Sequence, residues 1–431
     1  MLAEKMRRGQ YHISDDVPSL IDISIKVVAD NFERYPSLPG LRVQSIIDKI
    51  IDQVSVTLDI KHTAPTIDHE SYWKKACEFK WKVVTTNYHG WSWKQTYLEK
   101  HMQEIVSKLT EDDVPRIIRA YENSIKLIKE EIKEGRESGN KDKESTRRGF
   151  FSIGEDDCTL LEALTASRNY IFGLELDELP SHLDLRVLFG NIPCLNRLKV
   201  TFGAKHLGSE YDRSHFGMRM TDAAALTKCI KNAQCLSFLS LPCNLIDDEL
   251  VKMLSKGFLL NKTLIELDLS HNRIGDHGAR RIAKFLFHTQ VLLSLNLSDN
   301  QIQYEGSRCI GQALRNNRSL QVLNLKHNRL DDKSGAKLCN DLQQNLVVRS
   351  LNLSSNMLSS LFCDKLSELL SEENSLLDLD ISCNLLVDQE SEESIKDDMI
   401  RSVEGLCEVL KRKCMLFKLD IRSCGLPKRK F

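Results

Sequence analysis

Several features that define other protein classes are missing from this sequence of 431 residues. It has no uninterrupted apolar run of about 18 residues, which argues against a transmembrane helix. Its start, MLAEKMRRGQYHISDD, lacks the apolar core of a secretory signal. Sixty basic and 61 acidic residues leave a net charge of −1, so we expect no general attraction to nucleic acid or to an anionic membrane.

The sequence is also poor in the patterns of catalytic and metal chemistry. Its 13 cysteines form no CxxC pair, and an odd count without regular spacing predicts reduced thiols in the cytoplasm or cytoskeleton. Neither phosphate-binding loops (GxxxxGK[ST], GxGxxG) nor hydrolase motifs (GxSxG, HExxH) occur. Zinc ligands could be imagined in Cys77, His89 and His101, but their spacing matches no compact zinc pattern. We therefore predict no enzyme activity, no cofactor and no metal.

One pattern is abundant. Between Leu236 and Leu386 the motif LxxLxLxxN occurs six times, and each closing asparagine follows the previous one by 28 residues. This period is typical of leucine-rich repeats, in which every unit supplies one short strand and one helix of a curved solenoid. The sequence predicts an α/β fold of the ribonuclease-inhibitor type, with parallel strands on the concave face and helices on the convex face. The six asparagines are Asn244, Asn272, Asn300, Asn328, Asn356 and Asn384.

The spacing within one unit has a physical reason. Side chains alternate across a strand, so Leu264, Leu267 and Leu269 are predicted to point into the solenoid, while Glu266 and Asp268 face outward. The asparagine amide can bond backbone groups left open where the strand ends. A single unit is too small to stand alone, so neighbours must cover its flanks and the array needs caps at both ends.

Both ends of the array are irregular. Imperfect strands are predicted around Leu174 and around Leu198, and a polar insertion covers 204–217. A second insertion covers 387–413, with an acidic stretch at 388–398, before a last strand in which Cys424 replaces the asparagine after an interval of 40. No apolar helix follows it. We predict that either a partner covers this last unit, helped by Lys428, Arg429 and Lys430, or the insertion folds back over it.

Residues 1–132 carry no repeat but show helical periodicity. They predict an all-α region, either a small domain or helices lying on a partner, joined by a polar linker at 133–149 to a solenoid at 150–431. The apolar stripes are Ile21–Ile25–Val28–Phe32, Val43–Ile47–Ile50–Val54, Trp73–Cys77–Trp81, Leu98–Met102–Ile105–Leu109 and, after Pro115, Ile117–Tyr121–Ile125–Ile128–Ile132.

The outward positions of the strands are candidates for protein binding. Small polar residues there, such as the row Asp268, Asn296, Asn324, Asn352 and Asp380, suit a tightly curved sheet and need no catalytic explanation. Any single charged residue is best interpreted as solvated surface, whereas the whole array favours a partner. The charged candidates are Arg197, Lys199, Glu266, Asp268, Asp378, Asp380, Lys418 and Arg422.

A tryptophan-rich block precedes the repeats. Its residues Tyr72–Trp73, Cys77, Trp81, His89–Gly90, Ser92–Trp93–Lys94 and Glu99–Lys100–His101 resemble the pre-repeat region of the T-complex-associated testis-expressed protein 1 family, also called dynein regulatory complex subunit 5. The chain departs from the family's pattern at Trp91, where a second glycine is expected.

This resemblance implies a non-enzymatic scaffold subunit of the nexin–dynein regulatory complex, which links doublet microtubules and regulates dynein-driven motility in the axoneme of cilia and flagella. The implied partners are other subunits of that complex and neighbouring axonemal proteins, with Trp73, Trp81, Trp91 and Trp93 as candidate contacts. The alternative is a Ran-type GTPase-activating protein, whose solenoid shares the 28-residue period. Such activators end in an acidic tail, whereas this chain ends in Pro427–Lys430, and they lack the tryptophan-rich block. A fragment of a cytosolic immune sensor is disfavoured, since no nucleotide-binding domain precedes the repeats.

Overall fold

The computed structural model describes residues 19–36, 38, 41–82, 85–86, 90–137, 159–204, 216–413 and 416–426. These residues form two compact units. The first takes its residues from 1–102 and 142–171, and the second from 103–141 and 172–431. The predicted division at 132 and 150 stays a prediction, and most of the predicted linker lies outside the described residues.

The described residues of the first unit form helices and no strand, as predicted for the region before the repeats. Two of its predicted stripes are buried through Ile25 and Phe32 and through Ile50 and Val54. Their outer ends are open to solvent, because each helix has only one covered face. The helices are α2 (Leu20–Asp30), α3 (Gln44–Gln53), α4 (Ile60–Thr63), α5 (Glu70–Lys80), α9 (Thr159–Ser167) and α6 (Trp93–Ser107), which runs on into the second unit.

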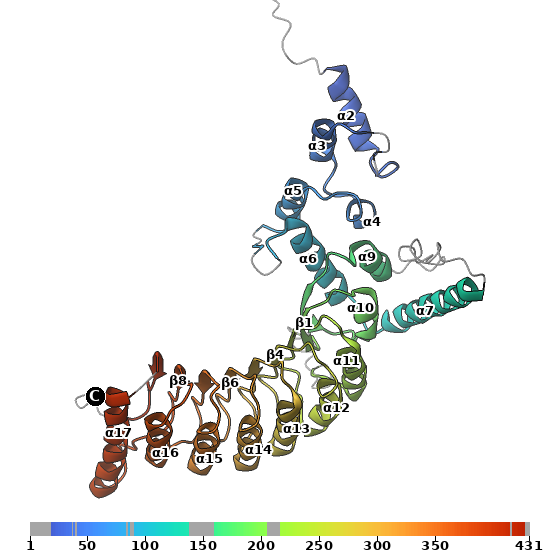
Figure 1. Ribbon diagram of the computed structural model, residues 1–431. Helices are drawn as coiled ribbons and strands as arrows, with labels where there is room; N and C mark the ends of the chain where they lie inside the picture. The colour runs from blue at the N-terminus through green and yellow to red at the C-terminus, as the bar shows by residue number, and fades with distance from the viewer. Residues whose placement is uncertain are drawn as a thin grey trace, which may run out of the picture. The chain divides into compact units, whose positions relative to one another are not determined.

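The second unit is a leucine-rich-repeat solenoid, which confirms the predicted fold class. Its nine described strands form one parallel sheet in sequence order, β1 to β9. Figure 1 shows the strands along one side and the helices along the other. The strands are β1 (Gly173–Leu179), β2 (Arg197–Phe202), β3 (Phe238–Ser240), β4 (Glu266–Asp268), β5 (Ser294–Asn296), β6 (Val322–Asn324), β7 (Ser350–Asn352), β8 (Asp378–Asp380) and β9 (Lys418–Asp420).

Helices connect successive strands, as parallel pairing requires. α7 (Val114–Glu137) precedes the sheet and continues into the first residues of the predicted linker. It lies against the first repeats, where the Tyr121 hydroxyl packs on Gly190 and Glu111 Oε1 accepts a hydrogen bond from Arg219 Nη2 at 2.7 Å. The others are α10 (Arg186–Asn191), α11 (Met220–Asn232), α12 (Asp248–Phe258), α13 (Asp276–His288), α14 (Tyr304–Leu314), α15 (Asp332–Leu342), α16 (Ser360–Ser371) and α17 (Glu393–Lys413).

The strand register follows the sequence period. Leu239 pairs with Leu267, which pairs with Leu295, and the series continues to Leu419. Leucines at the inward positions of β3 to β8 are almost completely buried. The repeat period therefore builds one continuous apolar core, since each copy places the same side chain on the same level.

The asparagine ladder also forms as predicted. Asn272 Oδ1 accepts hydrogen bonds from the Asn244 and Ile246 amides of the preceding repeat, both at 3.0 Å. Its Nδ2 donates to the Leu241 and Leu269 carbonyls, both at 2.9 Å. Asn272 thus bonds backbone groups of its own repeat and of the one before it, and ties adjacent repeats together.

A second ladder, on the helix side, was not predicted. Asn261 Nδ2 donates to the Ile230 carbonyl at 2.8 Å, while its Oδ1 accepts from the Thr263 and Leu264 amides. Asn317 and Asn345 make the equivalent bonds in later repeats. These asparagines belong to a series of positions 28 residues apart. Threonine takes the asparagine's place at position 289, so the series is interrupted and is easily overlooked in the sequence.

The helices are capped across repeat boundaries. The α13 helix begins after Gly275, which has no side chain to cap it. Asp248 of the preceding repeat supplies the cap, because its Oδ1 accepts from the Gly275 and Gly278 amides at 2.8 and 2.9 Å. A Cβ at position 278 would lie 2.6 Å from that oxygen. This close approach explains why glycine recurs near the start of the helices.

The 387–413 insertion provides the convex helix of the eighth repeat. α17 packs against α16 in the same way that the other helices pack on their neighbours. The first residues of the insertion contact the last unit, where the Val387 amide donates to the Cys424 carbonyl at 3.2 Å. Which group covers the rest of that unit stays a prediction. In that unit Cys424 replaces the asparagine as a donor, since its thiol lies 3.3 Å from the Ile381 carbonyl oxygen. The other predicted contributors at this end, Lys428 to Lys430, lie outside the described residues.

Candidate functional site

The concave sheet presents two rows of outward side chains, which the strand register aligns. One row runs Arg197, Phe238, Glu266, Ser294, Val322, Ser350, Asp378 and Lys418, and the other runs Lys199, Ser240, Asp268, Asn296, Asn324, Asn352, Asp380 and Asp420. The structure therefore places all eight charged candidates of the sheet and its edge on or beside one continuous surface. They do not converge on one point but lie along its length.

The basic residues at the first end of the sheet are already paired. Lys199 Nζ lies 2.7 Å from Asp177 Oδ1, and this hydrogen bond raises the pKa of the lysine. Arg197 Nε lies 3.6 Å from Glu175 Oε1, and its guanidinium stacks on the Phe238 ring at 3.8 Å. Strand β1 neutralises this end, so it is a mixed-charge surface and not a basic one.

Two of the acidic candidates, Asp268 in the middle of the sheet and Asp380 near its far end, stabilise the loops that follow their strands. Asp268 accepts from the Ser240 hydroxyl at 2.7 Å and from the Ser270 amide at 3.0 Å. Asp380 accepts from the Asn352 amide and from the Ser382 amide, both at 3.0 Å. These bonds explain the row of short polar residues, as predicted, through the geometry of the sheet.

The last strand ends in a charged pair. Arg422 donates from Nε to both oxygens of Asp420, at 2.9 and 3.0 Å. These hydrogen bonds hold the pKa of Asp420 down at about 2. Lys418 stays exposed on the same strand, and Phe417 beside it is 92 % exposed. An exposed aromatic next to an exposed lysine, on a strand at the edge of the described sheet, suits contact with another protein.

Much of the tryptophan-rich block is core. Trp73 is 1 % exposed and donates from Nε1 to the Ile67 carbonyl at 2.9 Å. Ser92 and the Trp93 amide both bond the Glu70 carboxylate, at 2.7 and 2.5 Å, and so join the start of α6 to α5. Trp73 therefore stabilises the first unit and cannot itself touch a partner in the folded state.

Three other residues of the block, Lys94, Trp81 and Trp93, are buried or half-buried and make contacts within the first unit. Lys94 is 3 % exposed, stacks on the Tyr170 ring at 3.7 Å and donates to Asp68, whose pKa this hydrogen bond lowers. Trp81 packs on Tyr97, with ring centroids 5.3 Å apart. Trp93 is half-buried beside Lys74. These residues shape the unit more than they present surface.

Trp91 is different. It is 73 % exposed, and its φ is 64°, in the left-handed region that costs a non-glycine residue about 1–2 kcal/mol. Glycine is favoured in this conformation, so the family's second glycine fits the backbone here and tryptophan does not. A bulky aromatic in a strained and exposed position is a sign of function.

The imagined metal site is not assembled. Burial raises the pKa of the Cys77 thiol to about 12, and the thiol lies 3.8 Å from the Trp93 carbonyl oxygen. His101 instead lies 2.6 Å from Lys80, and His89 falls outside the described residues. Throughout the described ranges, no three histidine, cysteine or acidic side chains are placed to hold a metal ion. No described helix combines the length and apolar character needed to cross a bilayer.

A charged ridge at the end of the strands was missed. The residue before each ladder asparagine has positive φ, and at three consecutive repeats it is His271, Asp299 and His327. Both imidazoles bond the central carboxylate, through Nδ1 at 2.7 and 2.9 Å. At the same position Cys243 and Cys383 are exposed, whereas Cys424, which takes the asparagine position of the last repeat, is buried. The 28-residue spacing of these positions was available as a signal, but it gave no indication of the side-chain direction.

Comparison with known proteins agrees with this geometry. A family model described as Leucine Rich repeat matches residues 260–283, 288–311 and 316–339. The chain is 31 % identical over 240 residues to dynein regulatory complex subunit 5 of Chlamydomonas reinhardtii, covering 55 % of this chain and 50 % of that protein. It is 29 % identical over 301 residues to the Mus musculus protein of the same name, with coverage of 62 % and 52 %.

The predicted resemblance is thus confirmed, and the chain spans about half the length of the curated relatives it matches. Among solved structures, an internalin of Listeria monocytogenes is 21 % identical with a TM-score of 0.36, covering 61 % of this chain and 64 % of that one.

Proposed function

We propose that this chain, which resembles dynein regulatory complex subunit 5, is a non-enzymatic scaffold subunit of the nexin–dynein regulatory complex in the axoneme of motile cilia and flagella. The observation that carries the proposal is the shared name of its relatives. The structure supports the proposal in two ways. The outward polar groups of the sheet are bonded to neighbouring strands and loops, and the residues that remain available lie on exposed surfaces suited to protein contact. In this role the chain helps to link doublet microtubules and to pass control to the dyneins.

A stacked solenoid suits such a role because it is stiff. Each repeat is joined to the next by an in-register strand pair, an asparagine amide such as Asn272, and in several repeats a carboxylate such as Asp248. Two partners bound at separate repeats are therefore held at a fixed separation. A linker between moving microtubules requires such a property, and it needs no reactive group.

The proposed contacts lie in the first unit and in the last repeats. In the first unit they are the exposed Trp91 and the half-buried Trp81 and Trp93. In the last repeats they are the half-buried Asp378, the exposed Lys418 and Arg422, and the acidic stretch 388–398 that leads into α17. Trp73 is left out because it is buried. The remaining sheet candidates, Arg197, Lys199, Glu266, Asp268 and Asp380, are available only as part of a mixed-charge concave surface.

The proposal is tested by fractionating ciliated cells that carry the tagged full-length protein. After detergent removes the ciliary membrane, we expect the protein to remain with the axoneme and to be lost when other subunits of the complex are deleted. A Trp91→Ala variant should be retained less well, whereas Phe79→Ala, at another exposed aromatic of the same unit that is not a proposed contact, serves as a control. Release of the wild-type protein into the detergent-soluble fraction would contradict the proposal.

A GTPase assay separates the proposal from the activator alternative. The purified chain should leave the GTP hydrolysis rate of Ran-type GTPases unchanged. Stimulation by several orders of magnitude, as activators produce, would overturn the scaffold assignment.

A further inference from the structure

The convex face of the solenoid carries a ladder of lysines that neither the core nor the concave sheet uses. Lys228, Lys256 and Lys284 occupy the same position of three consecutive repeats, 28 residues apart, on α11, α12 and α13. All three are exposed, and within the described part of the chain none of them has an ion-pair partner. A second ladder, Lys252, Arg280 and Arg308, runs one turn earlier on α12 to α14. We call these six residues the convex basic ladders.

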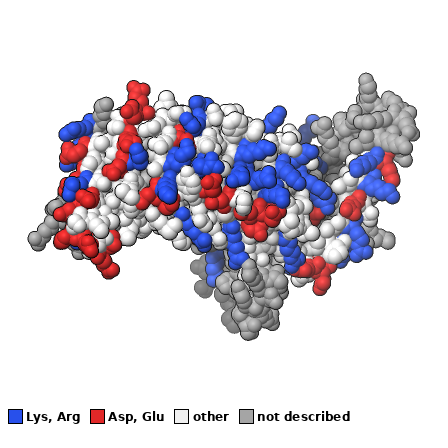
Figure 2. Space-filling view, turned by 90° about the horizontal axis from the view of Figure 1, so that it is seen from below, with Lys and Arg blue, Asp and Glu red and all other residues white. Residues whose placement is uncertain are grey.

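The same positions change charge along the solenoid. After Lys284 the first ladder continues as Gln312, Asn340 and Glu368, and after Arg308 the second continues as Ala336 and Asp364. The repeat architecture does not require a cation there, because other repeats fold without one. Figure 2 shows the result, with basic side chains dense over the middle of this face and acidic ones gathered at the end that holds α17.

The acidic residues near the ladders are already engaged. Glu249 pairs with Lys252 at 2.9 Å, and Glu305 pairs with Arg308 at 2.8 Å. Asp276 caps the next helix by accepting from the Gln303 amide at 2.7 Å. The first ladder, together with Arg280, therefore presents positive charge that the described residues do not neutralise.

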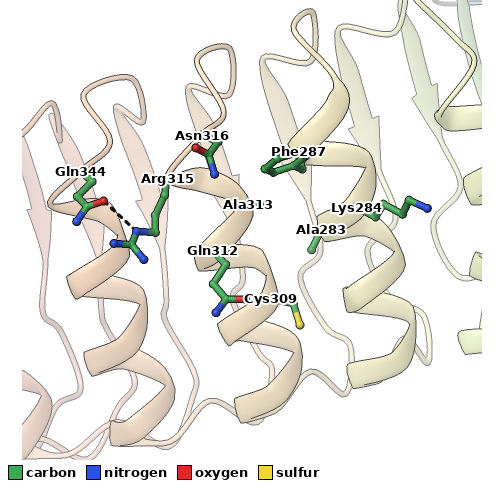
Figure 3. Close-up of a pocket in the computed structure, with 9 residues that line it drawn as sticks. All are labelled: Ala283, Lys284, Phe287, Cys309, Gln312, Ala313, Arg315, Asn316 and Gln344. Carbon is green, nitrogen blue, oxygen red and sulfur yellow. Dashed lines mark hydrogen bonds between the residues drawn. The ribbon is translucent and has the colours of Figure 1, made fainter.

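A groove opens beside this charge. It has a volume of about 530 Å³ and lies between α13, α14 and the end of α15. Its lining is mostly polar, with Lys284 on one side and Arg315 on the other, and its apolar part includes Ala283, Phe287 and Ala313 (Figure 3). Phe287 is 49 % exposed. Arg315 is held in place by a hydrogen bond from Nε to Gln344 Oε1 at 3.0 Å.

We propose that the convex basic ladders and this groove bind an acidic polypeptide segment that anchors one apolar side chain against Phe287. The cations of neighbouring repeats are separated by roughly the 8–10 Å between packed helices, whereas duplex DNA presents about one charge per 1.7 Å of its axis. The sparse spacing suits carboxylates on a peptide, and the apolar wall suits a side chain. The inference does not rest on the function proposed above.

The test uses the purified full chain and a fluorescein-labelled poly-glutamate peptide with one central phenylalanine, measured by anisotropy at low and physiological ionic strength. The double reversal Lys256→Glu, Lys284→Glu should weaken binding at least about tenfold, because it replaces attraction by repulsion at two sites. The matched control Lys411→Glu, Arg412→Glu makes the same change of charge on the exposed face of α17 and should leave binding unaltered. Circular dichroism checks that all variants are folded.

Two further measurements identify the ligand class. Phe287→Ala should weaken binding of the phenylalanine peptide severalfold but leave a peptide with alanine at that place unchanged. Single-stranded DNA and vesicles containing phosphatidylserine should bind more weakly than the peptide. The inference is overturned if the double reversal has no effect, if the phenylalanine peptide does not bind even at low ionic strength, or if DNA or vesicles bind more tightly through the same lysines.

Discussion

Replacing one ladder asparagine tests how the repeats are held together. Asn300 is buried. Its Nδ2 donates to the Leu269, Leu297 and Ser298 carbonyls at 3.0, 3.1 and 3.2 Å, and its Oδ1 accepts from the Ile274 amide at 3.0 Å. Asn300→Ala removes all four bonds at once while leaving the apolar core untouched.

The consequences of the four losses differ. Each of the three carbonyls keeps another donor, since Asn272 also bonds Leu269, Asn328 also bonds Leu297, and the His271 amide also bonds Ser298. The Ile274 amide keeps none in the described structure. An orphaned buried N–H costs about 1–3 kcal/mol, and the other bonds contribute toward the lower end of about 0.5–1.5 kcal/mol each. We therefore expect Asn300→Ala to lower the free energy of unfolding by about 2–4 kcal/mol.

Asn296 provides the control. It lies in the same repeat, at the end of β5, but its side chain is half-buried and its Oδ1 accepts one bond, from the Ser298 amide at 3.1 Å. Asn296→Ala should cost about 1 kcal/mol or less. Urea unfolding followed by circular dichroism measures both, as a shift of the midpoint at constant slope. A lower slope for Asn300→Ala would show that the array has split into separately unfolding parts. If both variants lower the free energy of unfolding by the same amount, the asparagine ladder does not hold the repeats together in the way described.

Three other predictions follow from the structure. Gly306→Ala should lower the free energy of unfolding by about 1–3 kcal/mol, because the added Cβ would lie 2.6 Å from a carboxylate oxygen of the preceding repeat. Gly405→Ala adds a Cβ in open space within α17 and should raise the free energy of unfolding by about 0.5–1 kcal/mol. Urea unfolding measures both. The hydrogen bond from Lys94 lowers the pKa of Asp68, so the ionised carboxylate stabilises the first unit. This contribution is present at neutral pH and is lost as the pH falls from about 4 through the lowered pKa. The Tm gap between wild type and Asp68→Asn should therefore close in acid. Trp91→Gly should raise the free energy of unfolding by about 1 kcal/mol by relieving the left-handed φ, and an unchanged or lower value would show that no strain is stored there.

The sequence predicted the repeats well because a fixed period turns a local pattern into a global one. A single leucine such as Leu267 does not predict a strand. Six copies of the motif at a fixed interval predict the strand, its inward face and the ladder to which Asn272 belongs. The leucine motif, even outside the period, also predicted the imperfect strand around Leu198, which pairs with Leu239 of the regular array.

Features that depend on contacts between repeats were harder to predict. Asp248 caps a helix 27 residues further on, and nothing in its own neighbourhood indicates that role. From the sequence, Arg197 and Lys199 were interpreted as unpaired cations. Their partners Glu175 and Asp177 lie on the first strand, whose irregular motif gives no register from which the pairing could be predicted. Side-chain direction was likewise hidden at Trp73, which a partner-binding interpretation placed on the surface and the structure places in the core.

The proposed function is that this chain acts through its protein-binding surfaces within a larger axonemal assembly. Cross-linking of intact isolated axonemes, followed by mass spectrometry, tests it most directly. We expect links to other regulatory-complex subunits from the tryptophan-rich block, through lysines such as Lys74, and from the last repeats, through Lys418. Recovery of the chain with no link to any subunit of that complex, or its absence from axonemes, would contradict it.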